Sequence, residues 1–202
     1  MAGNRLENVR VAALVTDEFE EIEFTSPRDA IQEEGGIVHL LAPAGREEWH
    51  VVRAVHHNNP AGRFEIDSTI EEANPEDYVA VILPGGALNA DKLRTNEAAR
   101  NFLRHINDDN KPIFVICHGA WTLISAGLVR GRRMTSYHSI KDDMVNAGAI
   151  WVDEPLVEDE NIVSSRHPGD LVQFNRRLVD KLAELDVSAM HERARELMMG
   201  EE

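Results

Sequence analysis

Short apolar runs, each followed by a polar or glycine-rich segment, recur along the chain. Four of them are VRVAALVT at 9–16, IVHLLA at 37–42, VAVIL ending at Leu83, and PIFVIC ending at Cys117. Unbroken apolar runs of this length are typical of parallel strands that are buried on both faces. The pattern therefore predicts four strands at the centre of a parallel sheet.

Segments with helical periodicity separate these runs. After the first run, Ser26 is expected to cap a helix with Pro27 in its first turn and Asp29 completing a capping-box pattern. The glycine pair at 35–36 should end that helix, and HGAWTLISAG should form another, closed by Gly127. Apolar stripes mark two further helices, one formed by Ala99, Phe102, Leu103 and Ile106, and one formed by Leu171, Phe174, Leu178, Leu182 and Leu185.

Two regions depart from this rhythm. Between Gly45 and Asp67 the pattern weakens, and we expect two short strands joined by a turn around Asn58 to Gly62. SIKDDMVNAG is expected to form a short helix, and IWVDEPLVEDENIVSS to form strands around an acidic turn. The regular alternation of strands and helices predicts an α/β fold, a doubly wound and mostly parallel sheet between helices, in a single domain over 1–202.

Composition narrows the class of protein. The chain has 202 residues and a net charge of −15, which argues against nucleic-acid binding because that depends on basic side chains facing phosphates. No apolar stretch approaches the length of a membrane span, and the N-terminus lacks the apolar core of a signal peptide. The one cysteine cannot form an internal disulfide, so we expect a reducing, cytoplasmic location.

Three motifs follow predicted strands directly: DEFEE at 17–21, PGG at 84–86 and CHG at 117–119. In a doubly wound sheet the carboxyl ends of the strands share one edge, and ligands bind where the strand order reverses. We therefore expect these three motifs, distant in sequence, to form one pocket.

Cys117 has two interpretations. Free cysteines are often small buried hydrophobes. A position just before a helix, however, favours the thiolate, because unpaired amides and the positive end of the helix dipole lower the pKa of a thiol. His118 follows directly, and Gly119 permits an unusual backbone at the turn. This position favours a nucleophile over a filler.

The other two motifs stay open on local sequence alone. PGG is either a tight turn or a pair of glycine amides that stabilise an oxyanion. Asp17, Glu18 and Glu21 are expected to be solvated, as most acidic clusters are. One carboxylate of this segment, if it lies beside Cys117, could instead hydrogen-bond the thiol or act as a general acid or base. The local sequence does not say which carboxylate this is.

The nine histidines do not predict a metal site. His56 and His57 are adjacent, whereas two ligands on a strand need a spacing of two to share a face. HxH, HExxH and CxxC motifs are absent from the sequence. We expect neither a metal nor another cofactor.

Taken in order, LVTDEFEEIEFTSPRDAIQEEGGIVHL, VILPGG, DKLR, KPIFVICHGAWTLISAG, GRRMTSY, IKDDMVNAGAIWVDE and VSSRHPGDL resemble the PfpI family of intracellular proteases. That family belongs to the superfamily containing the Parkinsonism-associated deglycase. The similarity covers about residues 9–185 and implies a flavodoxin-like fold with a nucleophile elbow. The family usually has proline after CHG, where Ala120 stands here.

The resemblance also implies roles for particular residues. The nucleophile falls on Cys117, the adjacent histidine on His118 and the family glutamate on Glu20. The oxyanion and substrate-binding backbone falls on Gly85, Gly86 and Gly119. Aligning DKLR points to Asp91 as the acid that reaches a neighbouring subunit, with one extra residue before it. Family members form dimers or larger assemblies, so a homo-oligomer is expected.

Three functions follow from these expectations. The first is addition of the Cys117 thiolate to reactive carbonyls, of the glyoxalase or deglycase type and part of a stress response. The second is an intracellular cysteine peptidase in which His118 is the base, although a histidine directly after the nucleophile must swing back to reach it. The third is a redox sensor or chaperone. A glutamine amidotransferase typically carries a downstream His-x-Glu pair, which HPGD at 167–170 does not match.

The segment 186–202 extends beyond the resemblance. Its apolar residues Val187, Met190, Ala194 and Leu197 follow a helical spacing. It is expected to be either a helix packed on the same or a partner subunit, or a frayed acidic tail.

Overall fold

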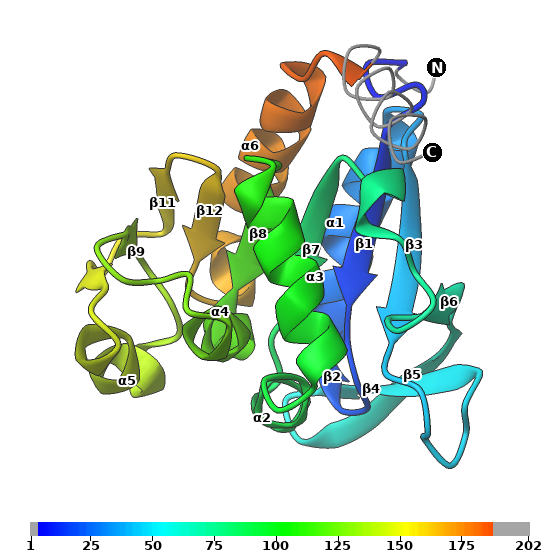
Figure 1. Cartoon of the computed structure of the whole chain (residues 1–202), viewed down its shortest axis with the longest axis horizontal. Helices are drawn as coiled ribbons and strands as arrows, with labels where there is room; N and C mark the ends of the chain where they lie inside the picture. Colours follow the sequence, from blue (N-terminus) through cyan, green and yellow to red (C-terminus); the bar gives the residue numbers. More distant parts are fainter. Residues whose placement is uncertain (1–3, 188–202) are drawn as a thin grey trace, which may run out of the picture.

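The structure is a computed structural model, described for residues 4–187, and its centre is a seven-stranded sheet (Figure 1). The strand order is β11-β12-β8-β7-β1-β3-β6. All neighbouring strands are parallel except β11, which runs antiparallel to β12 at one edge. The strands are β1 (Arg10–Leu14), β3 (Ile37–Ala42), β6 (Ser68–Thr69), β7 (Ala80–Leu83), β8 (Ile113–Ile116), β11 (Leu156–Asp159) and β12 (Ile162–Ser165).

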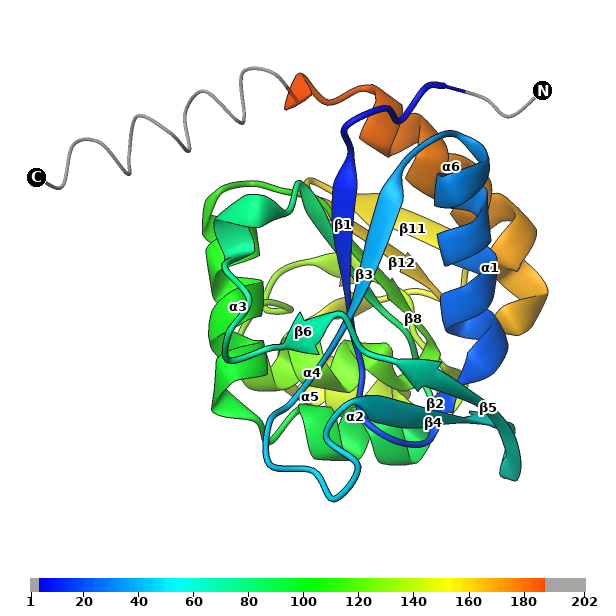
Figure 2. The same cartoon turned by 90° about the vertical axis from the view of Figure 1, so that its right-hand side faces the viewer.

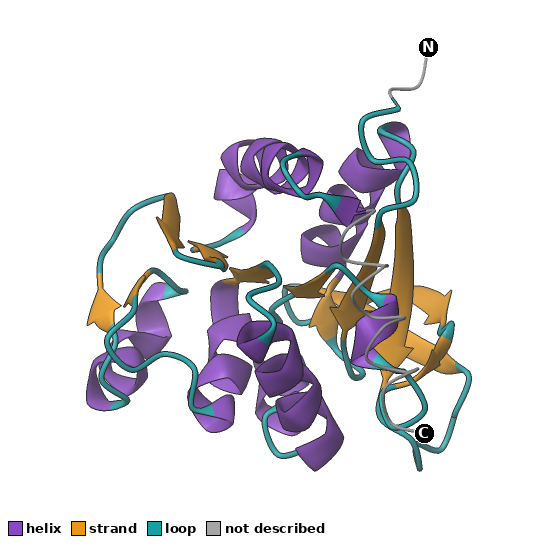
Figure 3. Cartoon of the chain, turned by 45° about the horizontal axis from the view of Figure 1, so that its top comes forward, coloured by secondary structure: helices purple, strands orange, loops and turns teal. Residues whose placement is uncertain are grey.

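Helices cover both faces of this sheet (Figures 2 and 3). One apolar layer forms between the sheet and helices α1 (Glu21–Glu33) and α6 (Leu171–Ala183), where Phe114 and Phe174 meet edge to face. The other layer lies under α2 (Ala87–Leu93), α3 (Glu97–Asp108), α4 (Ala120–Ala126) and α5 (Lys141–Asn146). The predicted α/β fold with a doubly wound, mostly parallel sheet is confirmed, and so are the apolar stripes of α3 and α6.

Two small sheets complete the fold. β2 (Phe19–Glu20) pairs with β4 (Val51–His56), which forms a hairpin with β5 (Asn59–Glu65). β9 (Arg133–Met134) pairs with β10 (Ile150–Trp151). The remaining elements are short 3-10 turns: η1 (Pro75–Asp77), η2 (Cys117–Gly119), η3 (His138–Ile140) and η4 (Pro168–Asp170). None of the helices between residues 4 and 187 is long and apolar enough to cross a membrane.

The helix after β1 begins six residues earlier than expected, at Glu21 instead of at Pro27 after Ser26. Its buried apolar face is formed by Phe24, Pro27 and Ile31, at helical spacing. Burial of Phe24 outweighs the one hydrogen bond that Pro27 cannot make, because most helix stability in proteins comes from packing. Ser26 is therefore no cap, and its hydroxyl accepts a hydrogen bond of 2.7 Å from Asn175 on α6.

One other local prediction was wrong, and one helix was not predicted. The hairpin turns at His57 and Asn58, earlier than the expected Asn58–Gly62, and His57 adopts a left-handed φ of 58°. Helix α2 follows PGG directly and was not expected, because its seven residues are too few to show a periodic stripe. Of the extension at 186–202, Val187 packs against the core, and the other three residues of the expected stripe lie outside the described residues.

The topology creates the crevice that the sequence predicted. From β1 the chain moves to β3 and β6 on one side, then returns to β7, β8 and β12 on the other. The strand order therefore reverses between β1 and β7, and β8 lies next to β7. The segments after these three strands are DEFEE, PGG and CHG, which meet at the edge where α/β proteins bind ligands.

Candidate active site

Cys117 stands on a sharp strand-to-helix turn. It follows β8, opens η2, and has a φ of 61°, in the left-handed region that residues other than glycine seldom adopt. Holding such a residue there costs about 1–2 kcal/mol. Gly119 makes the turn possible, since a Cβ at this position would lie 2.5 Å from the carbonyl oxygen of Leu83. The start of α4 thereby packs directly on the end of β7.

Glu23 provides the carboxyl group that contacts the thiol. Its side chain is fully buried, its Oε2 accepts a 2.7 Å hydrogen bond from the amide of Gly85, and the carboxyl lies beside the Cys117 thiol. Burial raises the pKa of Glu23 to about 8, with a further contribution from the charge of Glu20. Glu23 is therefore mostly protonated at neutral pH.

The Cys117 thiol is subject to opposing influences. Burial, followed by the negative charge of Glu23, raises its pKa, whereas hydrogen bonds from the backbone amides of His118 and Gly86 lower it. The amides at the helix start therefore lower the pKa of the thiol, as expected. Burial raises this pKa by more, because Cys117 is only 8% exposed. Because Glu23 itself holds a proton near neutral pH, the thiol and this carboxyl titrate as a coupled pair.

His118 lies beside the thiol without needing to swing back. Its Nδ1 is 3.3 Å from Cys117 Sγ, and its Nε2 is 3.2 Å from the hydroxyl of Ser139. Its ring lies 4.8 Å from that of Tyr137. Burial, and to a smaller extent the charge of His138, lowers the pKa of His118, so the imidazole is neutral near pH 7 and able to accept a proton.

Glu20, the glutamate that the resemblance indicated, is placed differently. Its Oε2 accepts a 2.8 Å hydrogen bond from the backbone amide of His57, and its Oε1 lies 3.4 Å from His56 Nδ1. Glu20 ends β2, whereas Glu23 stands in the first turn of α1, where it reaches Gly85 and the thiol. The one signal for Glu23 in the sequence was a lone charge in the otherwise uncharged run IEFTSP.

The glycines of PGG are closely fitted to the site. A Cβ on Gly85 would lie 2.5 Å from Glu23 Oε2 and 2.7 Å from Cys117 Cβ. Gly86 has a φ of 88°, and a Cβ there would lie 2.5 Å from the carbonyl oxygen of Glu18. These two positions therefore allow backbone, but no side chain, to approach the thiol.

Asn89 on α2 is a further residue that the sequence reasoning missed. It is fully buried, and its side chain donates to the carbonyls of Pro84 and Gly85 at 3.2 and 2.8 Å. Its Oδ1 accepts from the amide of Thr16 at 2.7 Å. One amide side chain thus joins the ends of β7 and β1 and fixes the turn that carries Gly85.

A cavity of about 650 Å³ opens over the thiol. Residues from six separate segments line it, among them Glu20, Glu23, His57, Cys117, His118 and His167. The segment 167–169 contributes to its wall, although the sequence suggested no role for it. Asp91 is exposed on α2 and is not among the residues that line the cavity, so its reach into a neighbouring subunit stays a prediction.

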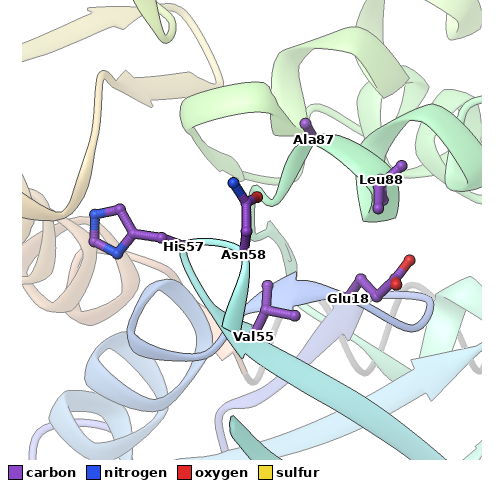
Figure 4. Close-up of a pocket in the computed structure, with 6 residues that line it drawn as sticks. All are labelled: Glu18, Val55, His57, Asn58, Ala87 and Leu88. Carbon is purple, nitrogen blue, oxygen red and sulfur yellow. The ribbon is translucent and has the colours of Figure 1, made fainter. Parts of the chain in front are cut away.

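A second, smaller hollow of about 230 Å³ adjoins the first (Figure 4). Its wall includes His57, Asn58 and Ala87, which also line the main cavity, together with Glu18, Val55 and Leu88. In Figure 4 the ring of His57 points away from Leu88 and Glu18. The two turn residues of the β4–β5 hairpin, His57 and Asn58, therefore line both hollows.

Comparison with known proteins identifies the family of this chain. The sequence profile of the DJ-1/PfpI family matches residues 9–181. The chain belongs to the DJ-1/PfpI family. It is 39% identical to the deglycase PfpI of Pyrococcus furiosus over 174 residues, which cover 86% of this chain and 99% of that one.

Two further members of the DJ-1/PfpI family show its range. The chain is 38% identical to a Bacillus subtilis protein named "Putative cysteine protease YraA", over 86% of this chain and 98% of that one. The structure of Schizosaccharomyces pombe DJ-1 superposes with a TM-score of 0.77 at 24% identity, covering 92% of this chain and 98% of that one, which shows the common fold. The names within the family thus include a deglycase and a protease.

Proposed function

We propose that this chain is a cofactor-independent cysteine enzyme that adds the Cys117 thiolate to reactive aldehydes, in glyoxalase- or deglycase-type chemistry. The observation that carries the proposal is the fully buried Glu23 carboxyl, which the Gly85 amide holds beside the Cys117 thiol and whose pKa burial raises to about 8. An acid poised near neutral pH can give and take protons during one turnover. The deglycase name of the Pyrococcus furiosus relative supports the same chemistry.

The proposed reaction begins with attack on the aldehyde carbon. The bond from Sγ to carbon forms as the carbonyl π bond breaks, the thiol proton passes to His118 Nδ1, and the carbonyl oxygen takes the proton of Glu23. The amides of Gly86 and His118, which hydrogen-bond the sulfur in the free enzyme, would stabilise the developing oxyanion. The product of this step is a hemithioacetal on Cys117.

For methylglyoxal the remaining steps regenerate the enzyme. The Glu23 carboxylate removes the proton from the carbon that bears the sulfur, which gives an enediolate. Glu23 then returns this proton to the neighbouring carbon, and the hydroxyl proton moves to the other oxygen, which gives a thioester. Water then hydrolyses the thioester: one proton of the water restores the acid form of Glu23, His118 returns its proton to the departing sulfur, and lactic acid leaves. Overall, methylglyoxal and water become lactate and a proton, and no electrons enter or leave.

A peptidase is the second candidate, and the position of His118 favours it. The neutral imidazole lies 3.3 Å from Sγ and is held on its other side by Ser139, which is the arrangement of a nucleophile, a base and an orienting group. The name of the Bacillus subtilis relative points the same way. We rank this activity second, because the buried Glu23 has no role in it.

Methylglyoxal turnover tests the proposal. Purified protein should form lactate, Cys117→Ala should form none, and Glu23→Gln should lose about 10²–10³-fold in kcat because it can no longer exchange a proton. Glu20→Gln should retain far more activity than Glu23→Gln, which separates the two glutamates. Cys117-dependent cleavage of casein without lactate formation would replace the carbonyl reaction with the peptidase.

A further inference from the structure

The hairpin turn gathers two histidines and a carboxylate at one point. His56 ends β4, and the left-handed backbone of His57 reverses the chain immediately after it. Two neighbours on a straight strand would point to opposite faces, but here the two rings lie 4.7 Å apart and nearly perpendicular. The ligand atoms of Glu20, His56 and His57 all lie within 4.8 Å of one another.

The Glu20 carboxylate is oriented but incompletely satisfied. The backbone amide of His57 anchors Oε2 at 2.8 Å, while Oε1 is buried and makes no hydrogen bond. His56 Nδ1 lies 3.4 Å from that oxygen, within ion-pair distance. A buried carboxylate oxygen without a donor is costly, and a cation is the partner that would satisfy it best.

We propose that Glu20, His56 and His57 bind a divalent transition-metal ion, with Zn²⁺ as the ion that fits this donor set. Two imidazoles and one carboxylate with a free position are the ligands of many zinc sites. Zinc bonds to nitrogen and oxygen of about 2.0–2.1 Å place tetrahedral ligand atoms roughly 3.3 Å apart. The 3.4 Å distance between His56 Nδ1 and Glu20 Oε1 matches this separation between ligand atoms.

The surroundings of the site agree with this assignment. His56 is 70% exposed along its side chain, so its ring is free to rotate onto an ion. Glu20 and His57 line the cavity that holds Cys117, so the remaining coordination positions open toward that cavity. The His57 amide holds the carboxylate in place, as the second layer of groups does in established metal sites.

One other cluster among residues 4–187 has similar donors, and it makes a natural control. His105 lies near Glu76 and Asp109. There, however, the ammonium group of Lys111 lies 3.1 Å from Glu76 and 2.9 Å from Asp109, so a protein cation already neutralises the carboxylates. We expect zinc at the hairpin and none at this second cluster.

Titration of the tag-free full chain with ZnCl₂ and CoCl₂ tests the site. The background is Cys117→Ser, because a free thiol could itself bind the ions. Calorimetry should give one zinc per chain, and cobalt should give absorption between about 500 and 650 nm, as expected of low-coordinate nitrogen and oxygen ligands. Zinc should also raise the thermal midpoint, because an ion that binds only the folded state stabilises it.

Three ligand variants and one control decide the outcome. His57→Asn removes a ligand while keeping a residue that tolerates the left-handed backbone. It should weaken zinc binding at least tenfold, as should His56→Ala and Glu20→Gln, whereas His105→Ala should bind as the background does. Unchanged affinity in His57→Asn and His56→Ala, or loss of binding in His105→Ala alone, would overturn the proposal. So would the absence of zinc binding to the background protein.

Discussion

Replacing Glu23 with glutamine should change how the stability of the protein depends on pH. The pKa of this carboxyl rises from 4.5 in the unfolded chain to about 8 in the folded one. Between these values the unfolded chain has released the proton and the folded protein keeps it, so the free energy of unfolding falls as pH rises. At about 1.4 kcal/mol for each pH unit, the loss between pH 5 and pH 8 is about 3–4 kcal/mol.

Glutamine is neutral at every pH and keeps the hydrogen bond from the Gly85 amide, so Glu23→Gln should lack this loss. Urea unfolding of both proteins from pH 5 to pH 8.5 measures the effect. With an m-value of about 2 kcal/mol/M, the midpoint of the variant should gain roughly 1.5–2 M on the parent across this range. Repeating both measurements in the Cys117→Ser background tests whether the thiol changes the pH at which Glu23 loses its proton. If the urea midpoints of the parent and of Glu23→Gln changed with pH in the same way, Glu23 would be ionised throughout this range. That result would refute the argument from burial.

Three other substitutions test how the site is built. Gly85→Ala places a Cβ 2.5 Å from Glu23 Oε2, so methylglyoxal turnover should fall more than tenfold and the free energy of unfolding by about 1–3 kcal/mol; normal turnover would contradict the close fit. Asn89→Leu leaves a buried amide and two carbonyls unpaired, so urea unfolding should show a loss of about 3 kcal/mol, and a loss below about 1 kcal/mol would count against its role. Ser139→Ala should lower kcat several-fold with little change in KM if the hydroxyl orients His118, and an unchanged kcat would show that it does not.

The central sheet could be predicted because its strands carry a local signal. β1, β3, β7 and β8 are buried on both faces and therefore appear as unbroken apolar runs. The start of α1 could not be predicted, because it depends on what Phe24 packs against and not on the capping residues nearby. Helix α2 is only seven residues long and is positioned by Asn89, whose hydrogen bonds reach segments distant in sequence.

The site was predictable at Cys117 and less so around it. The thiol, His118 and the PGG turn follow strands, and the topology of a doubly wound sheet brings such positions together. The sequence resemblance selected Glu20, whereas Glu23, three positions later, lies beside the thiol. The difference depends on where β2 ends and α1 begins. The hairpin turn likewise brings His56 and His57 together against the rule for straight strands. Both outcomes follow from backbone geometry that a residue pattern does not contain.

The cavity over Cys117 is lined by segments spread from Glu20 to Gly169. During translation, Cys117 and Glu23 therefore leave the ribosome dozens of residues before the segment 167–169 that contributes to the wall. A nascent chain stalled before that segment carries the thiol, but the cavity over it has an incomplete wall. Release of the segment 167–169 is then the event that completes this wall. Reactivity of this thiol toward alkylating reagents would consequently report on how far synthesis and folding have progressed.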